Sequence, residues 1–157
     1  MVKEREEEEI LFKVKMEEEE MREEEITWED VIKLFQRKPE LVENYLGVKI
    51  NRDTLVTDYK LTSARGVRTD MIFADTEGRD YIVKINYKQS PFFGLRDVSL
   101  WAKRYAEDKR VPIMDIIPGL IIDEESLNSY HNIKELDRFK IKYAAFKVSD
   151  ILKEFES

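Results

Sequence analysis

Two short apolar runs separated by a tight turn constrain the fold of this chain most strongly. MIFAD, residues 71–75, and YIVKINYK, residues 81–88, are rich in β-branched and aromatic residues, and TEGRD, residues 76–80, separates them with Gly78 near its middle. Runs of this length and composition are typical of strands, and a short polar segment with a glycine is typical of a hairpin turn. The sequence therefore predicts a β-hairpin over residues 70–88.

The second strand of this hairpin carries an unusual polar face. Side chains alternate along a strand, so Ile82, Lys84, Asn86 and Lys88 point to one side. A short turn can bring Asp70 beside the end of this strand, near Asn86 and Lys88. Carboxylate and amide oxygens suit Mg²⁺, and a lysine on the same face can position a water molecule and offset charge on a phosphoryl oxygen. These residues are candidates for phosphodiester hydrolysis, although a solvated strand would show the same alternation.

Helices and further strands flank the hairpin. Thr27 and Asp30 form a capping-box pattern that predicts a helix start, and Pro39 and Gly47 bound a second helix. Residues 48–61 alternate and predict one strand or a hairpin. The later elements are predicted as helix, strand, strand and helix over residues 95–108, 118–123, 141–148 and 149–155. This order predicts an α/β domain with a mixed central sheet flanked by helices.

Charge is distributed unevenly along the chain. The net charge is −7, and residues 1–30 hold 14 acidic and 5 basic residues, a net of −9, which leaves +2 for residues 31–157. We therefore divide the chain into an acidic N-terminal arm, residues 1–26, and a single domain, residues 27–157. Within the arm, residues 9–17 alternate and predict a strand, and the alternative is a glutamate-rich helix over residues 4–25.

Composition indicates a cytoplasmic protein. The chain has no cysteine, which fits a reducing compartment. No run approaches the roughly 18 apolar residues that cross a bilayer, and the glutamate-rich N-terminus is unlike a signal peptide. We therefore expect no membrane partner.

A fixed order of parts runs through residues 33–123. A helical segment contains LFQRKPELVENYLG, a polar strand VKINRDTLV follows, a glycine at position 66 precedes Asp70, and the hairpin leads through Lys88 to a helix with WAKRYAED. In this order the segment resembles the PD-(D/E)XK nuclease superfamily, most closely the catalytic domains of NucS-type DNA endonucleases and related RecB-like domains. The resemblance implies a restriction-endonuclease-like fold.

The same resemblance implies roles for individual residues. Asp70 would be the metal-binding aspartate, Lys88 the motif lysine, and Glu43, or Glu40, the helix glutamate that contacts the metal through water. The second motif acid is expected at position 86, where this chain has Asn86. A neutral amide binds metal more weakly than a carboxylate, so this departure implies a weakened site or a domain that only binds.

Two functions follow from the resemblance. The first is a deoxyribonuclease dependent on Mg²⁺ or Mn²⁺, in which Asp70, Asn86 and Glu43 hold the metal and Lys88 activates water. The residues expected to contact DNA are Arg65, Arg68, Lys84, Arg96, Lys103, Arg104 and Tyr105. The alternative is a catalytically degenerate module of the same fold that binds nucleic acid or protein.

The arm and one loop add further expectations about partners. The acidic arm could contact a basic protein, lie across the basic face of the domain and inhibit it, or only confer solubility. A strand in the arm could pair with a neighbouring copy in a homodimer. The segment SPFFG, residues 90–94, is predicted to interrupt the chain between the strand and a helix that begins at residue 95. Phe92 and Phe93 in this segment could wedge against or stack on a base, and the alternative is that they pack on the helix.

Overall fold

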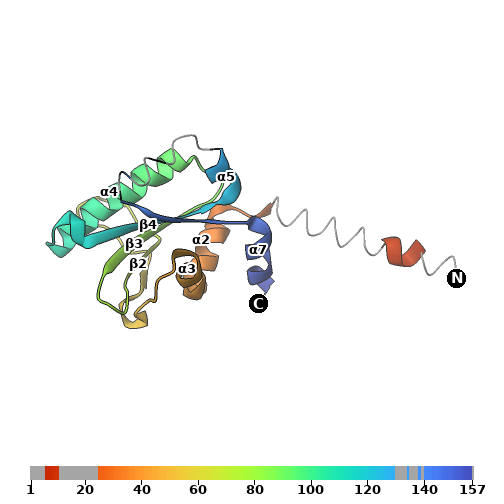
Figure 1. Cartoon of the computed structure of the whole chain (residues 1–157), viewed down its shortest axis with the longest axis horizontal. Helices are drawn as coiled ribbons and strands as arrows, with labels where there is room; N and C mark the ends of the chain where they lie inside the picture. Colours follow the sequence, from red (N-terminus) through yellow and green to blue (C-terminus); the bar gives the residue numbers. More distant parts are fainter. Residues whose placement is uncertain (1–5, 11–24, 130–133, 135–137, 139, 157) are drawn as a thin grey trace.

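A five-stranded sheet in the order β1-β2-β3-β4-β5 organises the computed structural model of this chain, which describes residues 6–10, 25–129, 134, 138 and 140–156 (Figure 1). The strands are β1 (Val56–Thr57), β2 (Met71–Ala74), β3 (Asp80–Asn86), β4 (Ile116–Asp123) and β5 (Lys142–Phe146). The pairs β1–β2 and β2–β3 are antiparallel, whereas β3–β4 and β4–β5 are parallel. The mixed sheet that the sequence predicts is therefore confirmed.

The predicted hairpin is formed by β2 and β3. Met71 pairs with Val83 at one end of the hairpin and Ala74 with Asp80 at the other, and the turn contains Gly78 in the left-handed region, with φ +83°. β3 continues for three residues beyond the last pair, because it ends at Asn86. This overhang is where the candidate site lies.

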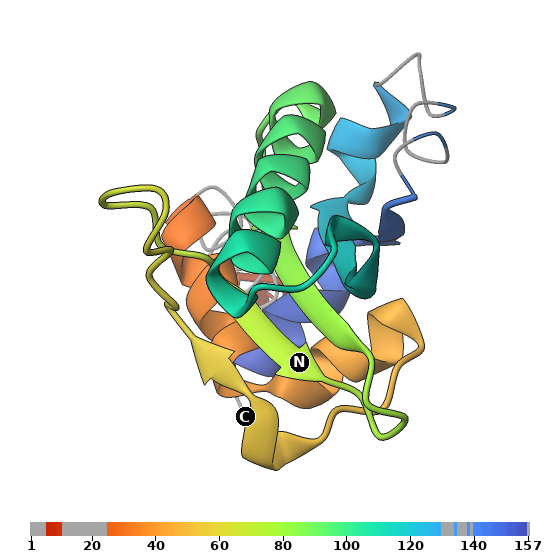
Figure 2. The same cartoon turned by 90° about the vertical axis from the view of Figure 1, so that its left-hand side faces the viewer.

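Helices cover both faces of the sheet. Figure 1 and the turned view in Figure 2 show α4 on one side of the strands and α2 and α3 on the other. The helices are α2 (Trp28–Arg37), α3 (Pro39–Leu46), α4 (Pro91–Lys109), α5 (Glu124–Asn128) and α7 (Val148–Leu152). Short 3₁₀ turns are η1 (Arg52–Thr54), η2 (Ile113–Asp115) and η3 (Lys153–Glu156).

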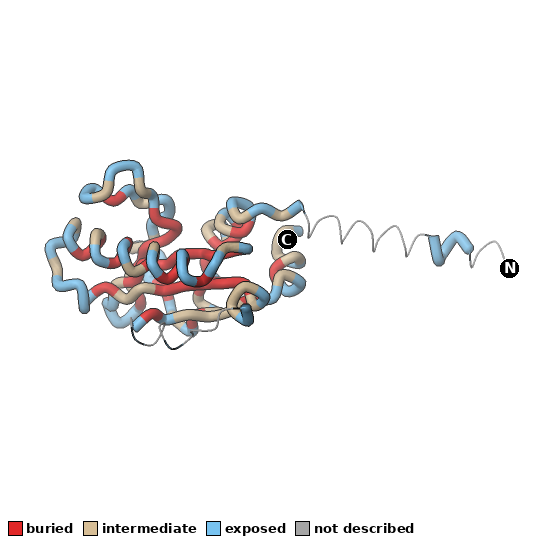
Figure 3. Tube along the Cα trace, turned by 90° about the horizontal axis from the view of Figure 1, so that it is seen from above, coloured by how far each residue is buried: buried red, intermediate tan, exposed pale blue. Residues whose placement is uncertain are grey.

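The two faces of β3 belong to different hydrophobic clusters. Val83 and Ile85 pack with residues of α2, α3 and α7, whereas Ile82 packs with residues of α4. Residues 81–87 are all buried, and Figure 3 shows burial along the central strands. A solvated face on this strand, one of the two interpretations of its alternation, is therefore wrong, because α4 covers that face.

Local signals set the helix boundaries. Thr27 and Asp30 form the predicted capping box at the start of α2, and Gly47 ends α3 with φ +65°. Pro91 is the first residue of α4, so this helix begins four residues earlier than predicted, as proline at that position allows. Residues 48–61 form η1 and the two-residue β1 rather than the one long strand or the hairpin that their alternation predicts.

The N-terminal arm differs from the strand prediction where it is described. Residues 6–10 are helical, so Glu9 and Ile10 do not begin a strand, and their helical form agrees with the alternative of a glutamate-rich helix. Glutamate favours helices, and a strand needs a paired neighbour. The remainder of the predicted strand, residues 11–17, lies outside the described residues. In the described part of the chain, no helix has the length and apolarity needed to cross a bilayer.

Candidate functional site

Two side chains cap the overhang of β3. The backbone N–H of Ile85 donates to Oδ2 of Asp70 at 2.8 Å, and the carbonyl of Ile85 accepts a hydrogen bond from Nε1 of Trp28 at 2.7 Å. A buried backbone group without a hydrogen-bond partner is costly. β2 begins at Met71, which pairs with Val83, so β2 offers no partner to Ile85. Asp70 and Trp28 therefore complete the hydrogen bonding of the strand where the sheet does not.

Lys84 is the first residue of this overhang. The pairing of Met71 with Val83 places Asp70 level with Lys84 across the two strands. Lys84 is only 3% exposed, and its Nζ lies 3.9 Å from Oδ2 of Asp97 on α4. The site therefore holds a buried ammonium next to two carboxylates.

Two indole rings enclose the same ammonium. Nζ of Lys84 lies 4.5 Å from the centroid of the Trp28 ring and 4.9 Å from that of Trp101. Trp28 comes from α2 and Trp101 from α4, so the lysine bridges the helices on the two faces of the sheet. Contacts of a cation with aromatic faces stabilise its charged form.

Burial shifts the pKa values of both partners in opposite directions. Burial raises the pKa of Asp70 to about 6, and the hydrogen bond from Ile85 and the charge of Lys84 act against this rise. Burial lowers the pKa of Lys84, and the charges of Asp70 and Asp97 act against this fall. Each charged group thus favours the ionised form of the other at a buried site, where water does not solvate them.

Helix α2 also holds the backbone of Asp70. Nε2 of Gln36 donates to the carbonyl of Asp70 at 3.0 Å and to Oδ1 of Asp58 at 3.1 Å. Trp28 and Gln36 were missed by the sequence analysis, although their spacing of eight residues places both on one helical face. The spacing was the signal in the sequence that could have identified these two residues. Their side chains make the two hydrogen bonds from α2 to Asp70 and Ile85.

The arrangement of this sheet and its helices is similar to the fold of a solved endonuclease structure. A repair endonuclease from Pyrococcus abyssi is similar to this chain with a TM-score of 0.50 at 11% sequence identity, over 78% of this chain and 48% of that chain. The chain has a restriction-endonuclease-like fold. The fold implied by the resemblance to PD-(D/E)XK nucleases is therefore confirmed.

A second solved structure, of an EndoMS-dsDNA2 complex, is similar with a TM-score of 0.49 at 9% identity, over 78% of this chain and 46% of that chain. This chain spans about half the length of each of these proteins. No protein-family model and no curated protein matches the sequence.

On this restriction-endonuclease-like fold, Asn86 is buried beneath α4. It is fully buried, and its Nδ2 donates to the carbonyl of Gln89 at 3.1 Å. Its Oδ1 receives no hydrogen bond from any described residue. A Cβ added at Gly94 would lie 3.1 Å from Cγ of Asn86, so the first turns of α4 pack directly on this amide. Asn86 lies on the same face of β3 as Lys84 and follows it by two residues. Lys84, and not Asn86, is therefore the residue level with Asp70.

The predicted motif lysine lies beyond the strand. Lys88 follows the end of β3 with φ +52°, and its side chain is exposed. Its backbone N–H donates to Oδ1 of Asp123 at 3.1 Å, and its Nζ lies 5.3 Å from the centroid of the Tyr87 ring. It stands four residues after Lys84, so the lysine level with Asp70 is Lys84 and not Lys88.

Glu43 lies toward the opposite end of β2 from Asp70. Its carboxylate accepts hydrogen bonds from the backbone N–H of Ile50 at 2.9 Å and from Nη2 of Arg52 at 2.7 Å. Ile50 pairs with Asp75, which follows the last residue of β2, whereas Asp70 precedes the first. Five residues of extended chain, about 16 Å, separate those two positions. The structure therefore does not bring Glu43 to Asp70.

Some of the residues predicted to contact DNA are exposed, and others are buried. Arg65, Arg68, Arg96 and Lys103 are exposed, and Arg104 is partly buried and pairs with Glu107 at 3.2 Å. Lys84 and Tyr105 are buried, so neither can contact a phosphate from the surface. The Tyr105 ring instead packs edge-on against Tyr59 at 5.3 Å between centroids.

The donor set around Asp70 does not fit a divalent metal ion. Among the residues that the structure describes, no three His, Cys, Asp or Glu side chains gather as a metal group. Glu40, the alternative helix glutamate, is exposed on α3. Asp70 already accepts from Ile85 and lies next to a buried ammonium, and Mg²⁺ requires near-octahedral oxygen ligands without a competing cation.

Proposed function

We propose that this protein is a nuclease-fold module that binds nucleic acid and does not cleave it by a metal-dependent reaction. The observation that carries the proposal is the level pairing of Asp70 with Lys84. A lysine at this position places a positive charge where a metal ion would need a second negative ligand. Repulsion between an ammonium and a divalent cation is strong at a buried site, because the effective dielectric constant is low.

The contacts of Asp70 support a structural role. Its carboxylate caps the N–H of Ile85, and Lys84 supplies the charge that offsets its burial. Asp97 approaches the same ammonium from α4 at 3.9 Å. The chain itself thus provides a cation at this site, which lies within 3.9 Å of Asp97 and interacts electrostatically with Asp70.

Exposed basic residues on connected elements support nucleic-acid binding. Arg96 and Lys103 lie on α4, and Arg65 and Arg68 lie on the loop formed by residues 58–70. Asp108 of α4 joins that loop to the helix, because its carboxylate accepts hydrogen bonds from Tyr59, Thr62 and Ser63.

Two acidic residues of α4 reduce part of this positive charge. Glu107 pairs with Arg104, and Asp97 lies 3.9 Å from Nζ of Lys84 and 3.6 Å from Nη2 of Arg96. Lysine and arginine contacts to phosphates provide affinity and orientation without reading sequence. We therefore expect binding that weakens steeply with salt and depends little on base sequence.

Binding in the absence of metal tests the proposal. Fluorescence anisotropy with a labelled DNA, in EDTA and low salt, should give saturable binding that R96A/K103A weakens about tenfold. The control K33A removes an exposed lysine from α2, on the other side of the sheet, and should change the affinity less than twofold. Absence of binding, or DNA cleavage in Mg²⁺ or Mn²⁺ that D70N abolishes, would overturn the proposal and favour the nuclease.

A further inference from the structure

Two aromatic side chains are exposed at the start of α4. Phe92 is 50% exposed and Phe93 is 43% exposed, although most phenylalanines of folded proteins are buried. Their rings lie 5.8 Å apart and are tilted by 71°. The guanidinium of Arg96 lies over the Phe93 ring, 4.9 Å from its centroid. This surface therefore presents aromatic rings and a cation together.

The same helical face continues toward the middle of α4. Positions 93, 96, 100 and 103 follow the spacing of one helical face, and Leu100 is 46% exposed. We call Phe92, Phe93, Arg96, Leu100 and Lys103 the aromatic stripe. The stripe contains two basic residues and no acidic residue. Asp97, the nearest acid in sequence, contacts Lys84 and Arg96.

We propose that the aromatic stripe binds unpaired bases of single-stranded nucleic acid. Bases stack on exposed aromatic rings, arginine adds a cation–π contact, and lysine contacts the backbone phosphates. A duplex hides the faces of its bases in the stack, so it can engage Arg96 and Lys103 but not the two rings. This inference rests on the proposed nucleic-acid binding and adds to it a preference for single strands.

The position of the rings links this surface to the end of β3. Gly94 follows Phe93 directly and packs on Asn86, the last residue of β3. The rings are therefore exposed at the end of α4 whose buried face packs on the overhang of β3.

Charge and composition favour nucleic acid over a peptide as the occupant. A peptide helix needs a continuous apolar groove, and this stripe places charged side chains between its apolar ones. An acidic amphipathic peptide is the competing occupant, and a synthetic peptide of residues 1–25 of this chain, with 12 acidic residues, serves as its probe.

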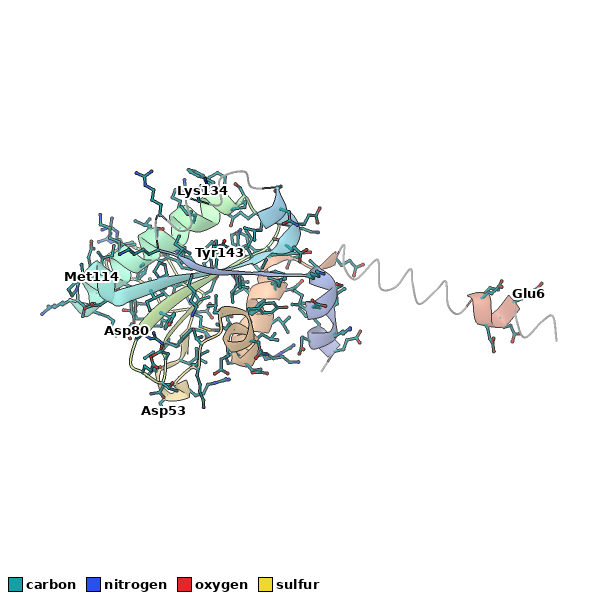
Figure 4. The ribbon with its side chains drawn as sticks, in the orientation of Figure 1. Glu6, Asp53, Asp80, Met114, Lys134 and Tyr143 are labelled. Carbon is teal, nitrogen blue, oxygen red and sulfur yellow. The ribbon has the colours of Figure 1, made fainter. Side chains whose placement is uncertain are left out.

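The test compares a labelled single strand of about 15 nucleotides with a duplex of the same sequence, using anisotropy in EDTA. In the full-length F92A/F93A variant, we expect single-strand affinity to fall about tenfold or more, because stacking carries that share of the binding. Duplex affinity should change less than twofold. The control I113A/M114A removes exposed apolar side chains beside the C-terminal end of α4, where Figure 4 labels Met114, and should alter neither affinity.

The outcomes separate this inference from the proposed function. Binding of neither single strand nor duplex by the wild-type protein would overturn both. Equal binding of single strand and duplex, unchanged in F92A/F93A, would overturn the aromatic stripe alone. Binding of the synthetic peptide that F92A/F93A abolishes, with single-strand affinity unaffected, would show a peptide surface and would also overturn the inference. Circular dichroism checks that the variants are folded.

Discussion

Asp70 and Lys84 lie level with each other on adjacent strands, and the carboxylate of one and the ammonium of the other share a buried site. Neither charge would be stable there alone, because transfer of a charge from water into a protein interior is costly. The pair instead holds the open end of β3, where Asp70 also caps Ile85.

The first prediction concerns the pH dependence of stability. The pKa of Asp70 is raised from 3.8 to about 6, so between these values the folded protein keeps a proton that the unfolded chain has released. The stabilising contribution of this proton is present below pH 3.8 and is lost as the pH rises through 6. D70N mimics the protonated form at every pH.

Urea denaturation of D70N and wild type at pH 4 and pH 7 measures this effect. The free energy of unfolding of D70N relative to wild type should rise by about 2 to 3 kcal/mol between the two pH values. Carboxylates common to both proteins cancel in this difference. Parallel pH profiles of the two proteins would contradict the raised pKa.

The second prediction removes the ammonium. K84M leaves the buried carboxylate of Asp70 without its counter-charge and should lower the free energy of unfolding by about 3 kcal/mol at pH 7.5. The loss should shrink at pH 5, where Asp70 takes up a proton. K33M, at an exposed position of α2, should stay within about 0.5 kcal/mol of wild type. If K84M lost the same free energy of unfolding at both pH values, the loss would come from packing and not from the missing counter-charge.

The open end of β3 could be foreseen from the sequence only in part. The hairpin was predictable, because two apolar runs and a turn with Gly78 have few other solutions. The register was not, and the expected proximity of Asp70 to Asn86 and Lys88 depended on it. The turn closes with Ala74 opposite Asp80, and this pairing places Lys84 level with Asp70. A shift of two residues keeps every side chain on its face, so alternation could not reveal the difference.

Contacts between distant elements were also beyond the sequence. Glu43 was expected near Asp70 from the order of parts, but the loop after α3 carries Ile50 to the far end of β2. Its carboxylate is used there by Ile50 and Arg52. The role of Trp28 depends on how α2 crosses the end of β3, and no local pattern fixes that crossing.

The third prediction tests the cap on the carbonyl of Ile85. W28F keeps most of the aromatic ring beside Lys84 but removes the Nε1–H donor, so the buried carbonyl loses its hydrogen bond. We expect a loss of about 1 to 2 kcal/mol in the free energy of unfolding. W101F is the matched control, because Trp101 faces the same ammonium and makes none of the capping bonds described above. Equal losses in the two variants would assign the effect to the rings rather than to the hydrogen bond.

The fourth prediction concerns the contact between α4 and β3. Alanine favours a helix over glycine by about 1 kcal/mol, so G94A would stabilise α4 if space were available. The added Cβ would lie 3.1 Å from Cγ of Asn86 and 3.3 Å from Cδ1 of Leu120. Asn86 is fully buried and cannot move into solvent, so we expect G94A to lose about 1 to 3 kcal/mol in urea denaturation. The double variant N86A/G94A should cost less than the sum of the single variants, and simple additivity would show that the two residues do not press on each other.

In the proposed function, the ammonium of Lys84 stands beside Asp70 where a metal ion would otherwise bind. The most direct test is a Mn²⁺ titration followed by electron paramagnetic resonance, in which wild type and D70N are compared under the same conditions. Ions held by the glutamates of the arm remain in both proteins, so the difference between them reports on the site at Asp70. With Lys84 opposite Asp70, the two titrations should coincide and DNA should remain uncut in Mn²⁺. One additional Mn²⁺ bound by wild type and lost in D70N, accompanied by DNA cleavage, would contradict this result and establish a metal-dependent nuclease.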